Sequence, residues 1–223
     1  MNKYSIINLV FEFIETCSPF ITLIALFTHG FKKPKLFKLL LIYSITYFIL
    51  SFYANYIFLF SHSNFFLRNV HSNIIIYIII SISSFCFFSL IIEQFIKKKK
   101  FRTLNRIVIT VAILFFISNA IWLEGTSIFN SNSSAIANII LIVYCIYYYK
   151  LQLEKPQNIF VEKESSFWII SGIFVYSGGN FFLFNMYKLL TQSFNDFTFY
   201  SWYINDLFIL VMNIFFAKGI RCN

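Results

Sequence analysis

The cationic run KKKKFR at residues 97–102 constrains this chain more than any other feature of its sequence. An apolar segment over 73–96 precedes the run, and another over 104–123 follows it. Each segment has the length that crosses a bilayer as a helix, about 20 residues, whereas the cations cannot lie in hydrocarbon. The run is therefore predicted to be a loop between two membrane-spanning helices. Because cytoplasmic loops are enriched in Lys and Arg, we expect this loop inside the cell.

The composition of the whole chain is also typical of a membrane protein. Of its 223 residues, 59% are hydrophobic and 12% are charged, against about 25% charged in soluble domains. The net charge of +9 does not indicate nucleic-acid binding, because the cations lie in short clusters between apolar runs. We expect the lipid bilayer as the surrounding partner, and no nucleic acid.

The hydrophobic pattern predicts an all-α fold, a bundle of seven transmembrane helices in a single domain, residues 1–223. The spans cover about 6–28, 36–60, 73–96, 104–123, 134–149, 166–188 and 198–218, the fifth being the shortest. Fifteen of the 18 Lys and Arg residues fall on the side of the 97–102 loop, and the other three are Lys3, Arg68 and Lys188. This bias predicts a multi-pass protein of the cytoplasmic membrane with its N-terminus outside and its C-terminus in the cytoplasm.

Familiar catalytic and cofactor motifs do not occur in the sequence. No connection between spans is long enough to bury a core of its own, and there is no HExxH, GxSxG, P-loop or GxGxxG motif. His29, His62 and His71 have no His, Cys or carboxylate at ligand spacing, and the last span lacks the lysine that retinal needs. We therefore expect no catalytic residues, no metal and no cofactor.

Acidic side chains within the spans are the strongest candidates for function, because an acid at this depth costs about 2.5–3.5 kcal/mol on insertion scales. Glu12 and Glu15 share one face of the first span, and Asp206 lies in the seventh beside Asn205. Other polar residues fall at similar depth, whereas the inner halves of the spans are mostly Ile, Leu, Phe and Val. We predict an outward-facing pocket for a cationic or amine-bearing ligand, or for protons. It would be lined by Glu12, Glu15, Asn55, Asn119, Asn180, Asn205 and Asp206.

The alternative for these polar groups is that they only tie the helices together by hydrogen bonds. Two other pairs of residues each predict a specific contact, one between helices and one at a helix end. Gly172 and Gly179, seven apart, predict close approach of a helix of the same bundle or of a second copy, as a homodimer. Glu93 lies four residues before Lys97, which predicts an ion pair at the inner end of a helix.

The last two predicted spans share a residue pattern with a known family. The pattern comprises Pro156, Phe167-Trp168-Ile169, Gly172, Tyr176, Gly179, Phe181-Phe182-Leu183-Phe184, Asn213-Ile214-Phe215-Phe216-Ala217, Gly219-Ile220 and Cys222. It resembles the end of the multi-helix membrane sensory region that precedes the kinase core in some bacterial histidine kinases. In that family a dimerisation helix with a phosphoacceptor histidine follows, whereas this sequence stops at Asn223, so we expect no kinase activity. The resemblance implies a sensory or accessory module in a bacterial inner membrane, with a signalling partner at the cytoplasmic face.

Two functional hypotheses follow from these observations. The first is a non-enzymatic membrane protein of sensor or receptor type, without an output domain, that signals through a partner. The second is a small intramembrane enzyme that modifies a lipid, or a solute carrier. Either form of the second hypothesis would use the carboxylates of spans one and seven.

Overall fold

The computed structural model describes residues 3–29, 34–60, 73–123, 129–154, 160–193 and 197–222. Several residues that enter the predictions above lie outside these ranges: Lys32, Lys33, Arg68, Lys155 and Pro156. The elements are α1 (Lys3–His29), α2 (Pro34–Phe60), α3 (Ile74–Phe95), α4 (Lys99–Ser118), the π-helical turn η2 (Asn119–Leu123), α5 (Ser131–Glu154), the 3-10 turn η3 (Val161–Lys163), α6 (Ser165–Ser193) and α7 (Phe197–Arg221).

Seven of the described helices are long and apolar enough to cross a membrane. This confirms the predicted all-α fold with seven spans. Helices are the expected form of such segments, because lipid offers no partner for backbone N–H and C=O groups and an α-helix satisfies them internally. The chain is thus a multi-pass helical membrane protein.

Several helices extend further than the apolar pattern predicts, and α5 and α4 are examples. α5 covers Ser131–Glu154 rather than 134–149, since its polar end turns continue the helix beyond the apolar stretch. α4 begins at Lys99, inside the cationic run, so part of the predicted loop is helical. Hydropathy marks only the part of a helix that suits hydrocarbon, and it therefore misses charged end turns.

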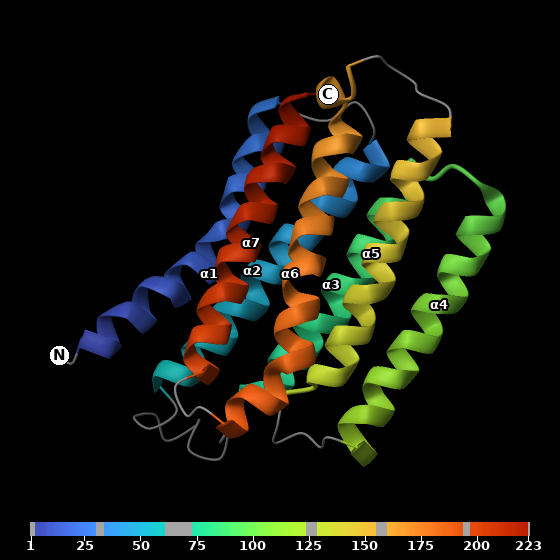
Figure 1. Cartoon of the computed structure of the whole chain (residues 1–223). Helices are drawn as coiled ribbons and strands as arrows, with labels where there is room; N and C mark the ends of the chain where they lie inside the picture. The colour runs from blue at the N-terminus through green and yellow to red at the C-terminus, as the bar shows by residue number, and fades with distance from the viewer. Residues whose placement is uncertain are drawn as a thin grey trace.

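Six of the helices form a closed ring. Neighbours in it are α1 and α2, α2 and α3, α3 and α5, α5 and α6, α6 and α7, and α7 and α1. α3 also contacts α6 across the ring. Figure 1 shows the helices side by side, with the first and last adjacent. Residues at opposite ends of the sequence can therefore share one site.

α4 lies outside this ring. It packs against α3 and α5, and Figure 1 shows it at the edge of the bundle. Only 11% of its most apolar stretch is buried, against at least 33% in each of the other six spans. Its uncovered side chains include Leu104, Ile107, Val111 and Leu114, which suits a helix that faces lipid on most of its circumference.

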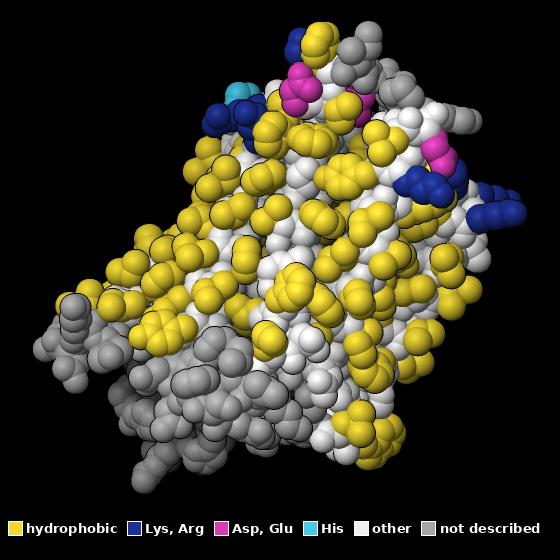
Figure 2. All heavy atoms as spheres, viewed as in Figure 1, with side chains coloured by type: hydrophobic (Ala, Val, Ile, Leu, Met, Phe, Trp, Pro, Cys, Tyr) yellow, Lys and Arg dark blue, Asp and Glu magenta, His cyan; other side chains and the backbone are white. Residues whose placement is uncertain are grey.

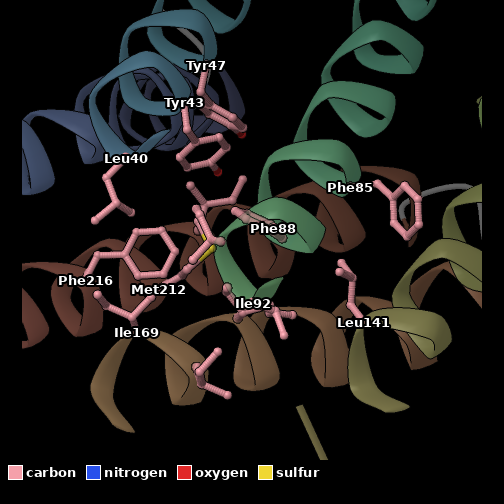
Figure 3. Packing of buried hydrophobic residues seen from close by; sticks show 14 of the residues in the cluster. Leu40, Tyr43, Tyr47, Phe85, Phe88, Ile92, Leu141, Ile169, Met212 and Phe216 are labelled. Carbon is pink, nitrogen blue, oxygen red and sulfur yellow. The ribbon is translucent and has the colours of Figure 1, made fainter. Parts of the chain in front are cut away.

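The core of the ring is a set of interlocked aromatic and aliphatic side chains. Tyr43 of α2 lies 4.9 Å from Phe88 of α3 and 6.3 Å from Phe216 of α7, measured between ring centroids. Figure 3 shows Met212 beside these rings. Phe88 also meets Tyr176 of α6 edge to face, at 5.5 Å. Rings in this geometry contribute about 0.5–1.5 kcal/mol per pair beyond their buried area, so four helices are held at one level.

Glycines allow α6 and α7 to approach closely. A Cβ atom at Gly172 would lie 2.9 Å from Cβ of Phe215 and 3.2 Å from the carbonyl oxygen of Met212. One at Gly219 would lie 2.9 Å from the carbonyl oxygen of Ser165. Gly179 faces the ring of Phe208, again on α7. The helix that packs against Gly172 and Gly179 is therefore α7 of the same bundle. Small residues at a helix interface permit such a close approach of two backbones.

The cations whose side chains the structure describes gather at one end of the bundle, which we call the basic end. Lys98 donates a hydrogen bond to the hydroxyl of Tyr147 near the end of α5, at 3.3 Å. Lys218 of α7 lies 4.6 Å from the ring centroid of Trp168 near the start of α6. Figure 2 shows Lys and Arg at the upper end and hydrophobic side chains along the sides below. The opposite end is called the far end.

Candidate functional site

The site begins at a bend in α1. Figure 1 shows the N-terminal part of α1 leaning away from the bundle. Pro19 lies inside this helix, and because proline has no N–H, the carbonyl of Glu15 loses its usual donor four residues on. The hydroxyl of Ser18 donates to that carbonyl instead, at 3.2 Å. The bend therefore occurs at the turn that carries Glu15.

The carboxylate of Glu15 lies inside the bundle, with 3% of the residue exposed. Tyr77 of α3 donates its hydroxyl to Oε2 at 3.1 Å. Asn55 of α2 donates to the same oxygen at 3.4 Å, and Tyr47 donates to Oε1 at 3.5 Å. The amide of Asn55 also reaches Oγ1 of Thr16, at 3.0 Å. Two helices, α2 and α3, thus supply hydrogen-bond donors to one acid of α1.

Asp206 of α7 is a second buried acid, with 5% of the residue exposed. Asn205 donates to its Oδ1 at 3.4 Å. Glu15 and Asp206 are close enough for their charges to act on each other, and half-buried Glu12 acts on both. We call this group the acidic cluster, and its members are Glu12, Glu15, Tyr47, Asn55, Tyr77, Asn205 and Asp206.

The acidic cluster contains no cationic side chain. Among the described residues, the ion pairs are Arg102 with Glu93 and Lys150 with Glu154, and neither belongs to the cluster. Nor do the described residues bring three or more His, Cys, Asp or Glu together as a metal site. Within the described part of the chain, the carboxylates therefore have hydrogen-bond donors but no cationic partner.

An aromatic cluster lies between the acids and the far end of the bundle. Tyr77, which bonds Glu15, lies 4.9 Å from Trp202, one turn before Asp206 on α7. Phe129 meets Trp202 at 5.1 Å and Phe184 at 4.9 Å, between ring centroids. We define the aromatic cluster as Tyr77, Phe129, Phe184, Tyr187 and Trp202. Tyr77 belongs to both clusters, so a rearrangement of the aromatic rings would change the hydrogen bond that Tyr77 donates to Glu15.

A polar link joins α1 to α7 closer to the basic end. Thr22 donates its hydroxyl to Oδ1 of Asn213 at 2.7 Å. The amide of Asn213 donates to Oγ of Ser18 at 3.4 Å, and Ser18 in turn donates to Glu15. The acidic cluster is therefore connected to the middle of α7 by continuous hydrogen bonds.

Five of the seven predicted site residues come together in the acidic cluster: Glu12, Glu15, Asn55, Asn205 and Asp206. Asn180 is fully buried on α6, and neither atom of its amide has a hydrogen-bond partner among the described residues. Asn119 is buried in η2, at the end of the peripheral helix α4. That all seven residues line one outward-facing pocket stays a prediction.

Sequence reasoning omitted several members of this region from the predicted site. Tyr47, Tyr77 and Tyr176 all lie within electrostatic reach of Glu15. The sequence shows only that each of these tyrosines places a hydroxyl in an apolar span. Such a hydroxyl needs a hydrogen-bond partner when it is buried. The polar groups are also not confined to one layer, because Ser44, Ser89 and Asn105 are fully buried elsewhere.

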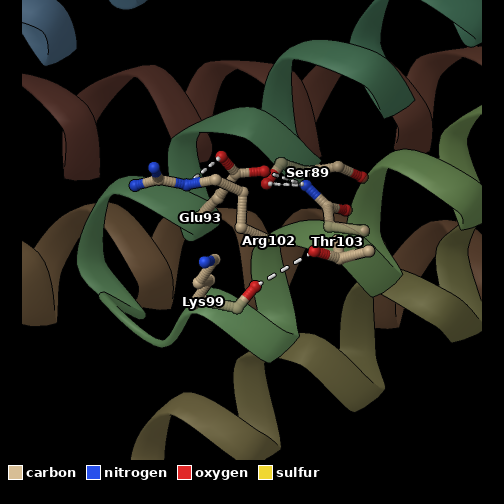
Figure 4. A network of polar contacts seen from close by, with 6 residues as sticks. Ser89, Glu93, Lys99, Arg102 and Thr103 are labelled. Carbon is tan, nitrogen blue, oxygen red and sulfur yellow. Dashed lines mark hydrogen bonds and ion pairs between the residues drawn. The ribbon is translucent and has the colours of Figure 1, made fainter.

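A separate polar network holds α3 to α4 at the basic end (Figure 4). Glu93 is buried and pairs with Arg102 at 3.2 Å, rather than with the predicted Lys97. α3 ends at Phe95, so Lys97 is not on the same helical face. The amide of Asn105 donates to Oε2 of Glu93 at 2.9 Å and to the carbonyl of Ser89 at 3.2 Å. This network is structural in form, since it closes the hairpin between α3 and α4.

The site and fold define a seven-helix membrane protein with a buried acidic cluster. No known family, curated protein or solved structure matches the chain.

Proposed function

We propose that this chain is a membrane protein of sensor or receptor type that binds a cationic group, an amine or a proton at the acidic cluster. It would lie in a cytoplasmic membrane with the far end outside and the basic end in the cytoplasm. Its state would pass to a signalling protein at the basic end. The observation that carries this proposal is a pair of buried acids, Glu15 and Asp206, that form no ion pair with any cation among the described side chains.

Two neighbouring negative charges at this depth are costly. An unpaired acid inside a membrane costs about 2.5–3.5 kcal/mol on insertion scales, and a second like charge adds repulsion. Hydrogen bonds from Tyr77, Asn55 and Tyr47 offset part of that cost for Glu15. A bound proton or cation would offset the rest, which favours exchange of such a ligand over a purely structural role.

The aromatic cluster favours an organic ammonium among the cations. Ammonium groups bind to faces of Trp and Tyr with about 0.5–2 kcal/mol per contact. Trp202 and Tyr77 lie next to the acids on the side of the far end. A ligand that enters from that end would meet aromatic rings first and carboxylates second.

α1 and α7 offer a route for the signal. Both carry acids of the cluster, and they are joined again by Thr22 and Asn213. α7 then continues to the basic end, where Lys218 and Arg221 lie in its last turn. A ligand that draws the acids together would shift α7 relative to α1. Such a shift changes the surface that a partner at the basic end would meet.

The proposal is tested by ligand binding to the purified chain in lipid nanodiscs. Tetramethylammonium, Na+ and mild acidification are the probes, and thermal unfolding is the readout. A ligand at 100 times its Kd stabilises by about 2.7 kcal/mol. We expect at least one probe to raise the Tm of the native chain, and Glu15→Gln with Asp206→Asn to abolish that rise.

The matched control is Glu154→Gln, which removes an exposed acid far from the cluster. It should respond to the probes as the native chain does. If no probe distinguishes the native chain from the Glu15→Gln, Asp206→Asn variant, the acids only tie helices together and the binding proposal fails.

The signalling part has its own test. A photo-crosslinking amino acid at Leu153, 84% exposed near the end of α5, should capture a signalling protein in native membranes. The same group at exposed Phe13, on the bent part of α1, should capture none. Equal capture at both positions, or none at Leu153 together with an unchanged transcriptional response on deletion of the gene, would contradict the sensor role.

A carrier is the second candidate, and one observation favours it. Buried polar side chains continue along α3 from the acidic cluster toward the basic end, at Ser84, Ser89 and Glu93. Such a series is typical of ion or proton pathways. Flux of the same probe cations into proteoliposomes would favour the carrier, whereas binding without flux would favour the sensor.

A further inference from the structure

A small cavity lies between α3, α5 and α6, next to the acidic cluster but apart from it. Its volume is about 20 Å³, and about 10–15 Å³ of such volume admits one water molecule. Its polar lining comes from Ser81 and Ser84 of α3, Ser134 and Asn138 of α5, and Tyr176 of α6. None of the seven predicted site residues lines it. The cavity has room for one water and several groups that could bind it.

Two hydroxyls of the lining lack partners. Oγ of Ser84 and Oγ of Ser134 form no hydrogen bond among the described residues, and each residue is only 3% exposed. A buried hydroxyl without a partner is costly, and proteins normally satisfy such groups with ordered water. Ser81, by contrast, already donates to the carbonyl of Tyr77, at 2.9 Å. The unsatisfied atoms are thus found where the free volume is.

We propose that this cavity is a binding site for a single ordered water molecule, held by Ser84, Ser134 and Tyr176. Each of these residues comes from a different helix, so the water joins α3, α5 and α6 where side chains alone leave a gap. The water site does not depend on the function proposed above.

Hydroxyl-radical footprinting with X-ray exposure tests the site directly, since radicals formed from a bound internal water label the side chains beside it. The measurement uses the full chain in nanodiscs. We expect labelling of Tyr176 to fall several-fold when Ser84→Ala and Ser134→Ala are combined, because the water then loses two of its partners. Tyr149 is a suitable internal control because it is partly buried, as Tyr176 is, but does not line the cavity, so its labelling should not change. Equal labelling of Tyr176 in the native chain and in the variant would overturn the proposal.

Removal of single hydroxyls tests the same site by thermal unfolding. Ser84→Ala and Ser134→Ala each remove a partner of the water, so both should lower the Tm. Ser44→Ala is the matched control, because Ser44 is fully buried, has no partner among the described residues and does not line the cavity. There the loss of an unsatisfied hydroxyl should leave the Tm unchanged or raise it. If all three variants raise the Tm alike, the cavity is dry and the proposal fails.

Discussion

The two ion pairs among the described residues differ in how deeply they are buried. Lys150 and Glu154 lie 3.9 Å apart with side chains 69% and 54% exposed, so water and salt screen the pair. Glu93 has a side chain only 6% exposed, although that of its partner Arg102 is 54% exposed. Loss of the first pair removes a weak attraction. Loss of the second leaves a buried carboxylate with fewer partners.

Arg102→Ala should therefore destabilise the chain by about 1–3 kcal/mol, the usual cost of an unsatisfied buried polar group, with the lower end favoured by the exposed guanidinium. Lys150→Ala is the control and should cost less than about 1 kcal/mol. Thermal unfolding in one detergent measures both. Glu93→Gln combined with Arg102→Ala should recover part of the loss, since no buried charge remains. Equal effects of Arg102→Ala and Lys150→Ala would contradict the role given to burial.

At the scale of the helices, hydropathy predicted all seven spans because each must match the thickness of hydrocarbon. It could not predict where helices end in water, as α4 and α5 show. Five residues of the acidic cluster were chosen from the sequence because acids and other polar side chains within a span normally face the interior of the bundle. The sequence did not indicate that Tyr47 and Tyr77 would be the partners of these acids. α2 and α3 are apolar on all sides, so their sequences carry little signal for which face turns inward.

The contact between α6 and α7 gives a prediction at this scale. Gly172→Ala should destabilise the chain by about 1–3 kcal/mol, because the new methyl group would overlap Cβ of Phe215 and force the helices apart. Gly178→Ala is the matched control, since a Cβ atom there meets nothing within 4 Å. That variant should be neutral or stabilising by up to about 1 kcal/mol, given the low helix propensity of glycine. Unfolding by heat in nanodiscs compares the two, and a more stable Gly172→Ala would show that α6 and α7 are not tightly packed.

For the whole molecule, the proposed function depends on which end of the bundle faces the outside. Tyr77 and Trp202 lie between the acids and the far end, whereas the cations with described side chains gather at the basic end. The positive-inside rule predicts that the basic end lies in the cytoplasm. In that orientation the proposed ligand would reach the acidic cluster from outside, and the proposed partner would meet the basic end from within. The opposite orientation would make the cluster a site for cytoplasmic ligands.

Reporter fusions decide the orientation. A phosphatase that is active only outside the cytoplasm should be active when fused within 124–128 and inactive when fused within the 97–102 run. A fluorescent protein that matures only in the cytoplasm should give the reverse pattern, which controls for failed insertion. Replacement of Lys97, Lys98, Lys99 and Lys100 by Gln should weaken the bias and produce chains of mixed orientation, because short cationic loops determine topology. Phosphatase activity at 97–102 and not at 124–128 would place the N-terminus in the cytoplasm, and an external ligand for Glu15 and Asp206 would then be excluded.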